Sequence, residues 1–484
     1  MADVKTGADH LAALRDGRAV FIDGARVDDV AAHPAFRNAV ESAAAFYDYQ
    51  ARPENLERMT FARVGASGGG YERVNRCWQL PRSYDELVAR RRALAEWADL
   101  TCGFFGRSPD HVASSLVGQV LGVDVFRRHG AARAQALLDY FDYASRHDRY
   151  VSYVIINPQA ERNKAWGEQA ADLVARIVDE DSGGITVRGA KMLGTAVIMA
   201  NDVLVANLQP LLAGEEDLAV SFVVPVATPG LKILSRKSFE AAAPSRADNP
   251  LAWRFDENDA LIWFDDVKVP WERVFVHRDT DMCRAQFHDT LGHTFQNYQA
   301  QIRLVAKTRF LVGVAHRLAE TIGTAVIPSV RETLGRLAAQ VAMVDGMVWG
   351  MEAKGYQAGE YFVPDKHLMY AAQVLTQDLY PTLIDTIRGL AGGALIMLPA
   401  SERDWANPEL AAIIGKTQRS PISRPRERVD FLKLAWDALG SEFAGRHTQY
   451  EMFYAGAPFV TCGHSYRTYD WAGAASLVGK MLER

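Results

Sequence analysis

The chain has few cysteines and no paired ones. Four occur among its 484 residues, at Cys77, Cys102, Cys283 and Cys462, and none forms a C-x-x-C motif. This pattern argues against a disulfide framework and against a zinc site, so we expect no bound metal. Buried cysteines usually act as small apolar side chains, and we expect that role here.

Long apolar runs and an excess of positive charge are also missing. No run reaches the length that crosses a bilayer, and the first twenty residues lack the basic and then apolar profile of a signal peptide. The formal net charge is -5, which favours neither nucleic acid nor an anionic membrane as a partner. We therefore expect a cytoplasmic protein that binds neither.

A dinucleotide-binding fingerprint is absent as well. The glycine-rich stretch GASGGGYERV, residues 65–74, follows no convincing strand and opens no clear helix. Both would be required for a nicotinamide-binding Rossmann turn. The sequence therefore offers no built-in site for a nicotinamide reductant.

The composition that is present indicates a large globular protein with three parts. Apolar residues make up 49% and charged residues 23%, and the length exceeds what one core usually supports. Apolar periodicity predicts helices around 35–50, 84–102, 109–122 and 131–146, then short β-rich runs from about 151, then long helices after about 276. We expect helical residues 1–150, a β-domain at 151–277 and a helical bundle at 278–484.

One short stretch, GFFGRSPDHV at 103–112, predicts a loop that turns into a helix. Ser108 is a favourable N-cap, Pro109 fits the first helical position, and Asp110 complements the helix dipole. Arg107 then lies just outside the helix and His111 one turn inside it. Arg107 is either ordinary surface charge or a ligand for an anionic or phenolic group.

Several segments resemble one family, the two-component flavin monooxygenases typified by 4-hydroxyphenylacetate 3-monooxygenase and the chlorophenol monooxygenases. The matching segments are GRSPDH, YVIINPQAER (153–162), VRGAKMLGTAVIMANDVLV (187–205), RFDENDALIWFDDVKVPWERVFVHRD (254–279) and LGSEFAGRHTQYEMFYAGAP (439–458). They follow the family's chain order from about residue 100 to 458. The resemblance implies an α+β, acyl-CoA dehydrogenase-like fold: an N-terminal helical domain, a central antiparallel β-barrel and a C-terminal four-helix bundle, assembled as a homotetramer.

The resemblance also implies an activity. Reduced FAD, delivered by a separate flavin reductase, would react with O2 to give a C4a-hydroperoxide that hydroxylates a phenol ortho to its OH group. Nothing in the sequence identifies the phenol, so both a free phenol and a phenol bound to a carrier stay open.

Four residues are the candidates for catalysis. Arg107 suits a phenolate because a guanidinium is always charged and offers several fixed donors. The hydroxyphenylacetate enzymes present Arg-x-x-x-Tyr and a histidine before I-x-N-P, whereas this chain has His111 and Tyr153, as if the two side chains were exchanged. His293 is a second candidate base, similar to a histidine in the halophenol branch, although such a residue also serves as a cap or packing residue. Histidine titrates near neutrality, which suits a general base.

Five residues are the candidates for holding the flavin. By resemblance, Thr195 lies against the ring system, and the side-chain amides of Asn157 and Gln159 bond it after a strand. Arg446 and His447 stand at a predicted helix start, where a cation or amide dipole can face reduced flavin or its phosphates. An exposed Arg-His pair is the alternative for the last two.

Two other activities remain possible on the same fold. An acyl-CoA dehydrogenase would need a glutamate base, and no segment marks one. A 4-hydroxybutyryl-CoA dehydratase would need several cysteine ligands and a histidine, but no second cysteine follows closely after Cys102 or His293. A non-catalytic scaffold would not be expected to keep Arg107, His111 and Tyr153 together.

Overall fold

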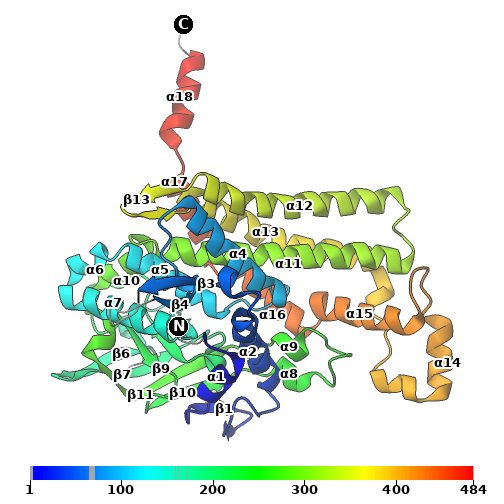
Figure 1. Ribbon diagram of the computed structural model, residues 1–484, viewed down its shortest axis with the longest axis horizontal. Coiled ribbons are helices and arrows are strands. Elements are labelled where there is room, and N and C mark those ends of the chain that lie inside the picture. The colour runs from blue at the N-terminus through cyan, green and yellow to red at the C-terminus, as the bar shows by residue number, and fades with distance from the viewer. Residues whose placement is uncertain (1–3, 65–70, 159, 162, 171, 483–484) are drawn as a thin grey trace.

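The structure is a computed structural model that describes residues 4–64, 71–158, 160–161, 163–170 and 172–482. Residues 65–70 of the glycine-rich stretch, and the predicted flavin ligand Gln159, lie outside the described residues. The molecule is α+β, as expected, with strands grouped on one side of a set of long helices (Figure 1). Within the described residues, no helix is both long and apolar enough to span a membrane.

The helices predicted in the first part of the chain are present. They are α2 (Arg37–Ala51), α4 (Tyr84–Leu100), α5 (Pro109–Leu121) and α7 (Ala131–Arg146), with α1 (Gly7–Ala13), α3 (Leu56–Met59) and α6 (Asp124–His129) as shorter additions. Four strands were not predicted in this part. They are β1 (Ala19–Ile22), β2 (Ala25–Val27), and the hairpin of β3 (Thr60–Val64) and β4 (Tyr71–Asn75).

The central strands form two sheets. The larger has the order β2-β1-β10-β11-β7-β6, adding β10 (Leu231–Ser235), β11 (Ala260–Pro270), β7 (Gly184–Lys191) and β6 (Arg176–Asp181). The smaller has the order β12-β9-β8-β5, with β12 (Val274–His277), β9 (Val220–Pro225), β8 (Asp202–Val205) and β5 (Val151–Val154). The runs ALIWF and VKVP belong to one strand, β11, whose register shifts between Phe264 and Val267.

The expected closed antiparallel barrel is wrong. In the described residues the two sheets stay separate apart from one bridge between Ile156 and Met192, and β1 pairs with β10, and β5 with β8, in parallel. The sheets pack face to face instead, for example through Phe222 and Phe264. Helices α5 and α7 contact strands β5 and β12 of the smaller sheet, so two edge strands are covered by helices instead of by further strands.

Strand alternation decides which side chains face the helices. In β5, Ser152 and Val154 point toward the other sheet, where Val154 joins the core between the sheets. Val151 and Tyr153 point the opposite way and join a second core beneath α5 and α7. The period of two therefore places Tyr153 on the same side as α5, which carries His111.

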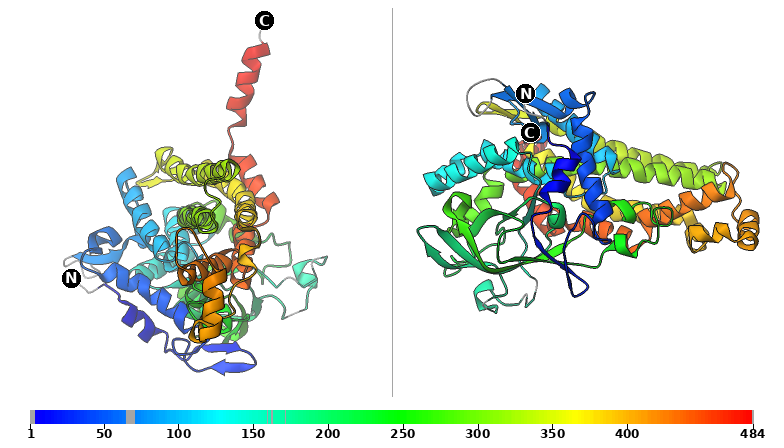
Figure 2. Two further views of the ribbon diagram at one scale, coloured as in Figure 1. Left: turned by 90° about the vertical axis from the view of Figure 1, so that its right-hand side faces the viewer. Right: turned by 60° about the horizontal axis from the view of Figure 1, so that its bottom comes forward.

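The last part of the chain is helical. Its long elements are α11 (Gly292–Ile322), α12 (Pro328–Ala353) and α13 (Lys366–Ala391), which pack on one another and are seen nearly end-on in Figure 2. The hairpin β13 (Tyr356–Ala358) and β14 (Tyr361–Val363) joins two of them. The remaining helices are α8 (Phe239–Ala242), α9 (Ala252–Phe255), α10 (Thr280–His288), α14 (Pro408–Thr417), α15 (Pro425–Leu439), α16 (Glu442–Phe453), α17 (Pro458–Thr468) and α18 (Trp471–Leu482).

Candidate active site

Arg107 lies in the loop between α4 and α5, directly before the start of α5. Ser108 occupies the N-cap position and Pro109 begins the helix, as predicted. The Ser108 hydroxyl does not cap the helix: it bonds the carboxylate of Asp110, a competing acceptor two residues on. The loop backbone is fixed by Glu257, which accepts from the Arg107 N–H at 2.8 Å.

The Arg107 guanidinium is buried without a carboxylate partner. It is 8% exposed, its Nη1 donates to the Tyr450 hydroxyl at 2.7 Å, and it lies 5.1 Å from the ring centres of both Tyr153 and Tyr450. In the part of the chain that the structure describes, no carboxylate pairs with this guanidinium. A buried cation in aromatic surroundings suits an anionic or phenolic ligand.

His111 and Tyr153 lie together beside Arg107. Their rings stack with centres 5.8 Å apart and an interplanar angle of 21°. Both ring nitrogens of His111 contact glutamines of α11, Gln299 at 2.8 Å and Gln296 at 3.0 Å. Burial, and then the charge of Arg107, hold the pKa of His111 well below its ordinary value. Three of the four predicted catalytic residues are therefore in contact.

His293 lies in a different group of side chains. It stands at the start of α11, where its ring packs against those of His288, Tyr370 and His464 rather than against Arg107 or Tyr153. Its Nδ1 atom is buried and has no hydrogen-bond partner among the described residues. Burial lowers the pKa of His293 well below its usual range.

The loops after β5 and β7 bring the predicted flavin residues Asn157 and Thr195 to one edge of the sheets. The bridge between Ile156 and Met192 joins the two loops. Beside it, the Lys191 Nζ donates to Asn157 Oδ1 at 2.6 Å, and burial lowers the pKa of Lys191 to about 7. Thr195 donates to Asp259 at 2.7 Å.

Arg446 connects this edge to Arg107. Its guanidinium donates to both oxygens of Asp259 and, at 2.7 Å, to Glu257, whose other oxygen binds the Arg107 backbone. Burial alone would raise the pKa of Asp259, but the charge of Arg446 lowers it below its ordinary value. Thr195, Arg446 and the Arg107 backbone therefore belong to one hydrogen-bonded network, joined through Asp259 and Glu257.

His447 lies behind this network. Its ring is buried against Phe104 and Phe443, and Lys307 lies 3.0 Å from its Nδ1. Both Arg446 and His447 are on α16, one turn after its Ser441 N-cap. The role of His447 toward a flavin stays a prediction.

Two models of one protein family match most of this chain. Residues 6–276 match the model described as 4-hydroxyphenylacetate 3-hydroxylase N terminal, and residues 283–483 match its C-terminal counterpart. The chain belongs to the 4-hydroxyphenylacetate 3-hydroxylase family.

Members of this family include well-matched relatives with different phenols in their names. The chain is 34% identical, over 96% of its length and 93% of the relative, to a 4-hydroxyphenylacetate 3-monooxygenase oxygenase component of Geobacillus sp. (strain PA-9). It is 33% identical, over 93% and 86%, to a 4-nitrophenol 2-monooxygenase oxygenase component of Rhodococcus sp. The oxygenase component HpaB, solved with FAD and 4-hydroxyphenylacetate, superposes with a TM-score of 0.92 at 30% identity, covering 99% and 98%.

Several residues of the site were missed by reasoning from the sequence, and four of them surround Arg107 and His111. Glu257 lies in a segment that resembles the family, and Tyr450 lies in another, but neither stands beside the site in sequence. Gln296 and Gln299 are spaced three apart on α11, a pattern that places both on one helix face. The spacing could have indicated a polar face on this helix, but it does not indicate which other helix that face contacts.

Tyr450 and Gly106 make a close contact that holds the Arg107 loop. The Tyr450 hydroxyl donates to the Gly106 carbonyl at 3.2 Å, and a Cβ on Gly106 would lie 2.6 Å from the Tyr450 ring. Only glycine leaves room for the ring at this point. Tyr450 thus joins α16, which carries Arg446, to the loop that carries Arg107.

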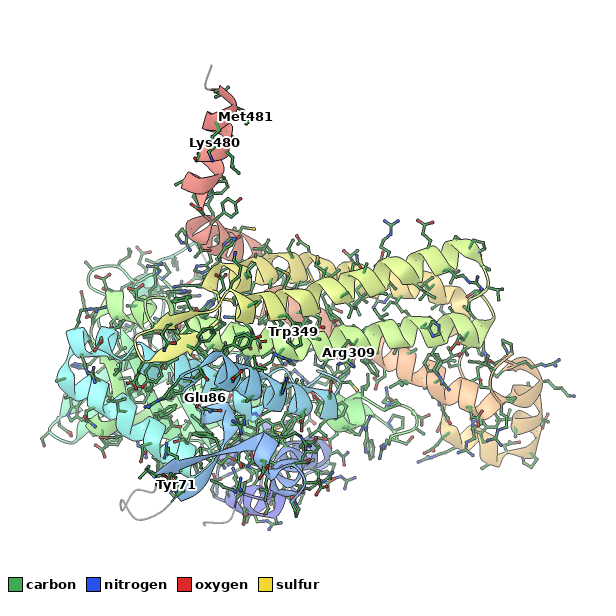
Figure 3. The ribbon with its side chains drawn as sticks, turned by 45° about the horizontal axis from the view of Figure 1, so that its top comes forward. Tyr71, Glu86, Arg309, Trp349, Lys480 and Met481 are labelled. Carbon is green, nitrogen blue, oxygen red and sulfur yellow. The ribbon has the colours of Figure 1, made fainter. Side chains whose placement is uncertain are left out.

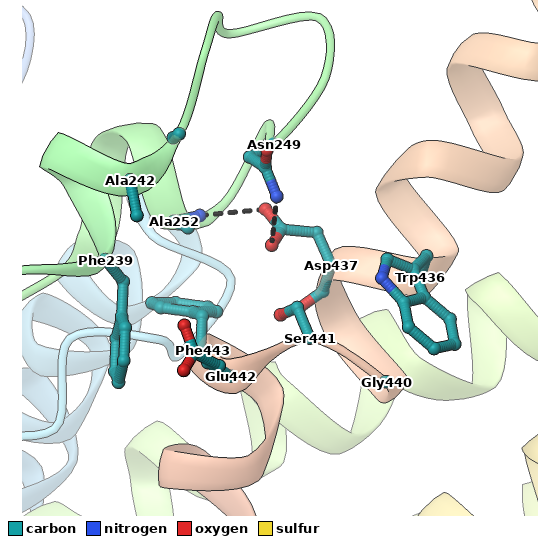
Figure 4. Close-up of a pocket in the computed structure, with 11 residues that line it drawn as sticks. Phe239, Ala242, Asn249, Ala252, Trp436, Asp437, Gly440, Ser441, Glu442 and Phe443 are labelled. Atoms are coloured by element: carbon teal, nitrogen blue, oxygen red, sulfur yellow. Dashed lines mark hydrogen bonds between the residues drawn. The ribbon is translucent and has the colours of Figure 1, made fainter. Parts of the chain in front are cut away.

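The molecule also has a surface cavity that is separate from this network. It has a volume of about 340 Å³ and lies between α8, α9, α15 and α16 (Figure 4). Phe239, Trp436 and Phe443 line it, and the Asp437 carboxylate is occupied by Asn249 and by backbone N–H groups. None of the predicted site residues lines this cavity.

Proposed function

We propose that this chain is the oxygenase component of a two-component monooxygenase, which uses reduced FAD and O2 to hydroxylate a phenol ortho to its OH group. The observation that carries the proposal is the buried Arg107 guanidinium without a carboxylate, next to Tyr153 and His111. The chain's membership of the 4-hydroxyphenylacetate 3-hydroxylase family supports the same reaction. Phenols are the substrates to test first, because the named relatives act on 4-hydroxyphenylacetate and 4-nitrophenol.

The residues at the sheet edge fit the polar groups of a flavin. The Lys191 amine bonds the Asn157 amide, and the Thr195 hydroxyl on the loop after β7 bonds Asp259, which Arg446 also binds. Lys191 and Asn157 retain N–H groups that can donate to the carbonyl oxygens of the pyrimidine ring, whereas the Thr195 hydroxyl, which donates to Asp259, can accept a hydrogen bond. When bound, reduced FAD supplies the activation of O2 for transfer of one oxygen atom to the phenol.

Arg107 prepares the phenol for that transfer. A phenol loses its proton at a pKa of about 10 in water, and a fixed guanidinium beside the oxygen stabilises the anion. The anion pushes electron density onto the ortho carbon, which is then the better nucleophile. The sequence names His111 and His293 as candidate acceptors for the proton, and only one of them needs to take that role. The burial of the site excludes water that would compete for the reactive oxygen.

The wider organisation follows the same proposal. We propose that a separate flavin reductase is the partner of this chain and that the chain assembles as a homotetramer. We also propose three domains: a helical domain at 1–150, a β-domain at 151–277, and a helical domain at 278–484 that contains a four-helix bundle. The element order supports the division, except that β1 and β2 of the first part join the larger sheet of the second. The outward-pointing α18, with exposed Leu477, Met481 and Leu482, supports an assembly of several copies (Figure 3).

A single-turnover experiment tests the function. Protein, chemically reduced FAD and one phenol from a panel are mixed with O2, and the hydroxylated product per flavin is measured. We expect product with at least one phenol, and Arg107→Lys is expected to lower kcat/KM by about 10-fold to 100-fold because the planar fork is lost. Arg309→Lys, at an exposed site, is the matched control (Figure 3).

Two outcomes would reject the proposal. One is complete oxidation of the flavin with release of hydrogen peroxide and no product from any phenol. The other is an Arg107→Lys variant that matches the Arg309→Lys control in kcat/KM, since Arg107 would then have no part in binding the phenol.

A further inference from the structure

Two glutamines of α11 occupy both ring nitrogens of His111. Gln299 Oε1 lies 2.8 Å from His111 Nδ1, and Gln296 Nε2 lies 3.0 Å from His111 Nε2. All three side chains are buried, so water does not compete for these contacts. The two amides therefore decide where the imidazole carries its proton.

The amide of Gln299 is oriented by its own partners. Its Nε2 donates to Asp110 Oδ2 at 3.1 Å and lies 3.5 Å from the Ser108 hydroxyl, which leaves its Oε1 toward His111. A carbonyl oxygen only accepts, so His111 Nδ1 must carry a hydrogen. Gln296 then donates to the lone pair on Nε2. The imidazole is neutral, and its one acceptor atom is already in use.

A second proton on His111 is favoured by the hydrogen bond to Gln299 but opposed by burial, by Gln296 and by two arginines. It would place an N–H on Nε2 against the N–H of the Gln296 amide. Arg107 in the loop and Arg303 on α11 add positive charge, and both lower the pKa of His111 further after burial. Asp110, on the same helix, is engaged by Ser108 and Gln299 rather than by the imidazole.

Tyr153 presents a free hydroxyl beside the same cation. Its ring is held between the stacked His111 ring and the Arg107 guanidinium. Among the described residues, no group hydrogen-bonds its hydroxyl, and the residue retains 8% exposure. A hydroxyl donates and accepts, so it can bond a phenol or a phenolate oxygen at the position that Arg107 faces.

We propose that Tyr153 binds the substrate's phenol oxygen together with Arg107, and that His111 is a positioning residue which the two glutamines hold in its neutral Nδ1–H form. This inference rests on the proposed function and narrows it. His111 orients the Tyr153 ring by stacking and takes no proton from the substrate.

Nitrogen NMR of the protein with ¹⁵N-labelled histidine tests the state of His111 without turnover. The His111 signals are assigned by their loss in His111→Asn and followed between about pH 5.5 and 8. We expect one protonated and one unprotonated nitrogen, unchanged over this range. Gln296→Glu should make His111 titrate within it, because a carboxylate accepts from Nε2–H, whereas the exposed Gln357→Glu should not.

Calorimetric binding of a phenol tests the role of Tyr153. Tyr153→Phe keeps the ring and removes only the hydroxyl, and we expect the Kd for the phenol to rise about 10-fold with the His111 signals unchanged. Wild-type His111 signals that titrate near pH 6.5, or a Tyr153→Phe variant with wild-type phenol affinity, would overturn the inference. Failure of the proposed function is separate: it shows as wild-type protein that forms no hydroxylated product.

Discussion

At the residue scale, a fully buried group of three charged side chains lies behind the candidate site. Glu451 accepts two hydrogen bonds from Arg303, at 2.7 and 2.8 Å, and one from Lys307 at 2.8 Å. All three side chains are buried. The carboxylate is the only anion in this contact, so removing its charge leaves two cations without compensation.

Glu451 is expected to make stability depend on pH in acid. Burial alone would raise its pKa, but Arg303 and Lys307 lower it to about 2, against about 4.3 in an unfolded chain. A lowered carboxyl pKa stabilises the fold fully above about pH 4.3 and progressively less as pH falls toward 2. The contribution lost is about 3 kcal/mol. Urea unfolding between pH 6 and pH 3 measures the part lost above pH 3, which is about half of this contribution.

A variant separates this effect from general acid sensitivity. At pH 7, Glu451→Gln should lower the free energy of unfolding by about 3 kcal/mol or more, so that the variant unfolds at a lower urea concentration. The difference in unfolding free energy between the variant and wild type should become smaller as the pH is lowered. Glu442→Gln, on the same helix but exposed, should behave like wild type. A deficit that stays constant with pH would contradict the assignment.

The residues of the site were only partly predictable from the sequence. Arg107 and His111 stand out beside a helix start, and Tyr153 lies on a β-rich run that must alternate. Their contact with one another, and the contacts of Glu257 and Gln296, depend on how distant segments pack. Local spacing carries no information about that packing, and for the same reason it could not distinguish His111 from His293 as a base.

At the element scale, α5 and α11 must approach closely for Gln296 and Gln299 to reach His111. Gly118 makes this possible, since a Cβ at this position would lie 2.1 Å from the Leu291 carbonyl oxygen. The obstacle is backbone at the start of α11, which cannot move aside as a flexible side chain could. The position therefore sets the distance between the two helices.

Gly118→Ala is expected to destabilise the protein by about 3 kcal/mol, through overpacking between α5 and α11. Its phenol hydroxylation should fall as well, since the contacts of His111 would be displaced. Gly313→Ala on α11 faces open space and should be neutral or slightly stabilising. Thermal unfolding of both variants checks this, and equal melting temperatures would refute it.

The elements themselves were predicted well where apolar periodicity is long. The four early helices and the long helices after 276 follow such patterns, and most central strands follow short β-rich runs. The strands β1 and β2 are only four and three residues long, and β6 is largely exposed and acidic, so none of them has a clear pattern. In the described residues the sheets do not close into a barrel, because helices cover two of the sheet edges. The sequence of a strand does not indicate which element will cover its edge.

At the scale of the whole molecule, α18 stands apart from the other helices. It extends away from the body, and none of its residues is buried (Figures 1 and 2). Met481 is 82% exposed and Leu477 is 64% exposed. Such an apolar helix in water costs free energy unless another surface covers it, which is why it supports the proposed tetramer.

Deletion of residues 471–484 is therefore expected to give a smaller assembly. Light scattering coupled to size-exclusion chromatography measures the molar mass of the full chain and of the shortened one. Lys480→Ala, which keeps the apolar side chains of α18, should assemble like the full chain. An unchanged molar mass after the deletion would show that α18 is not needed for assembly.

The parallel pairing of β1 with β10 has a consequence for how the protein is made. Ala19 lies opposite Lys232, and the same sheet then continues to β11, which ends at Pro270. An emerging chain cannot complete this sheet until more than half of the chain has left the ribosome. In the hairpin of β1 and β2, the edge of β1 that pairs with β10 therefore stays without its partner during that time. Synthesis of this protein should accordingly depend on chaperones that shield nascent strands, with the N-terminal hairpin as their first client.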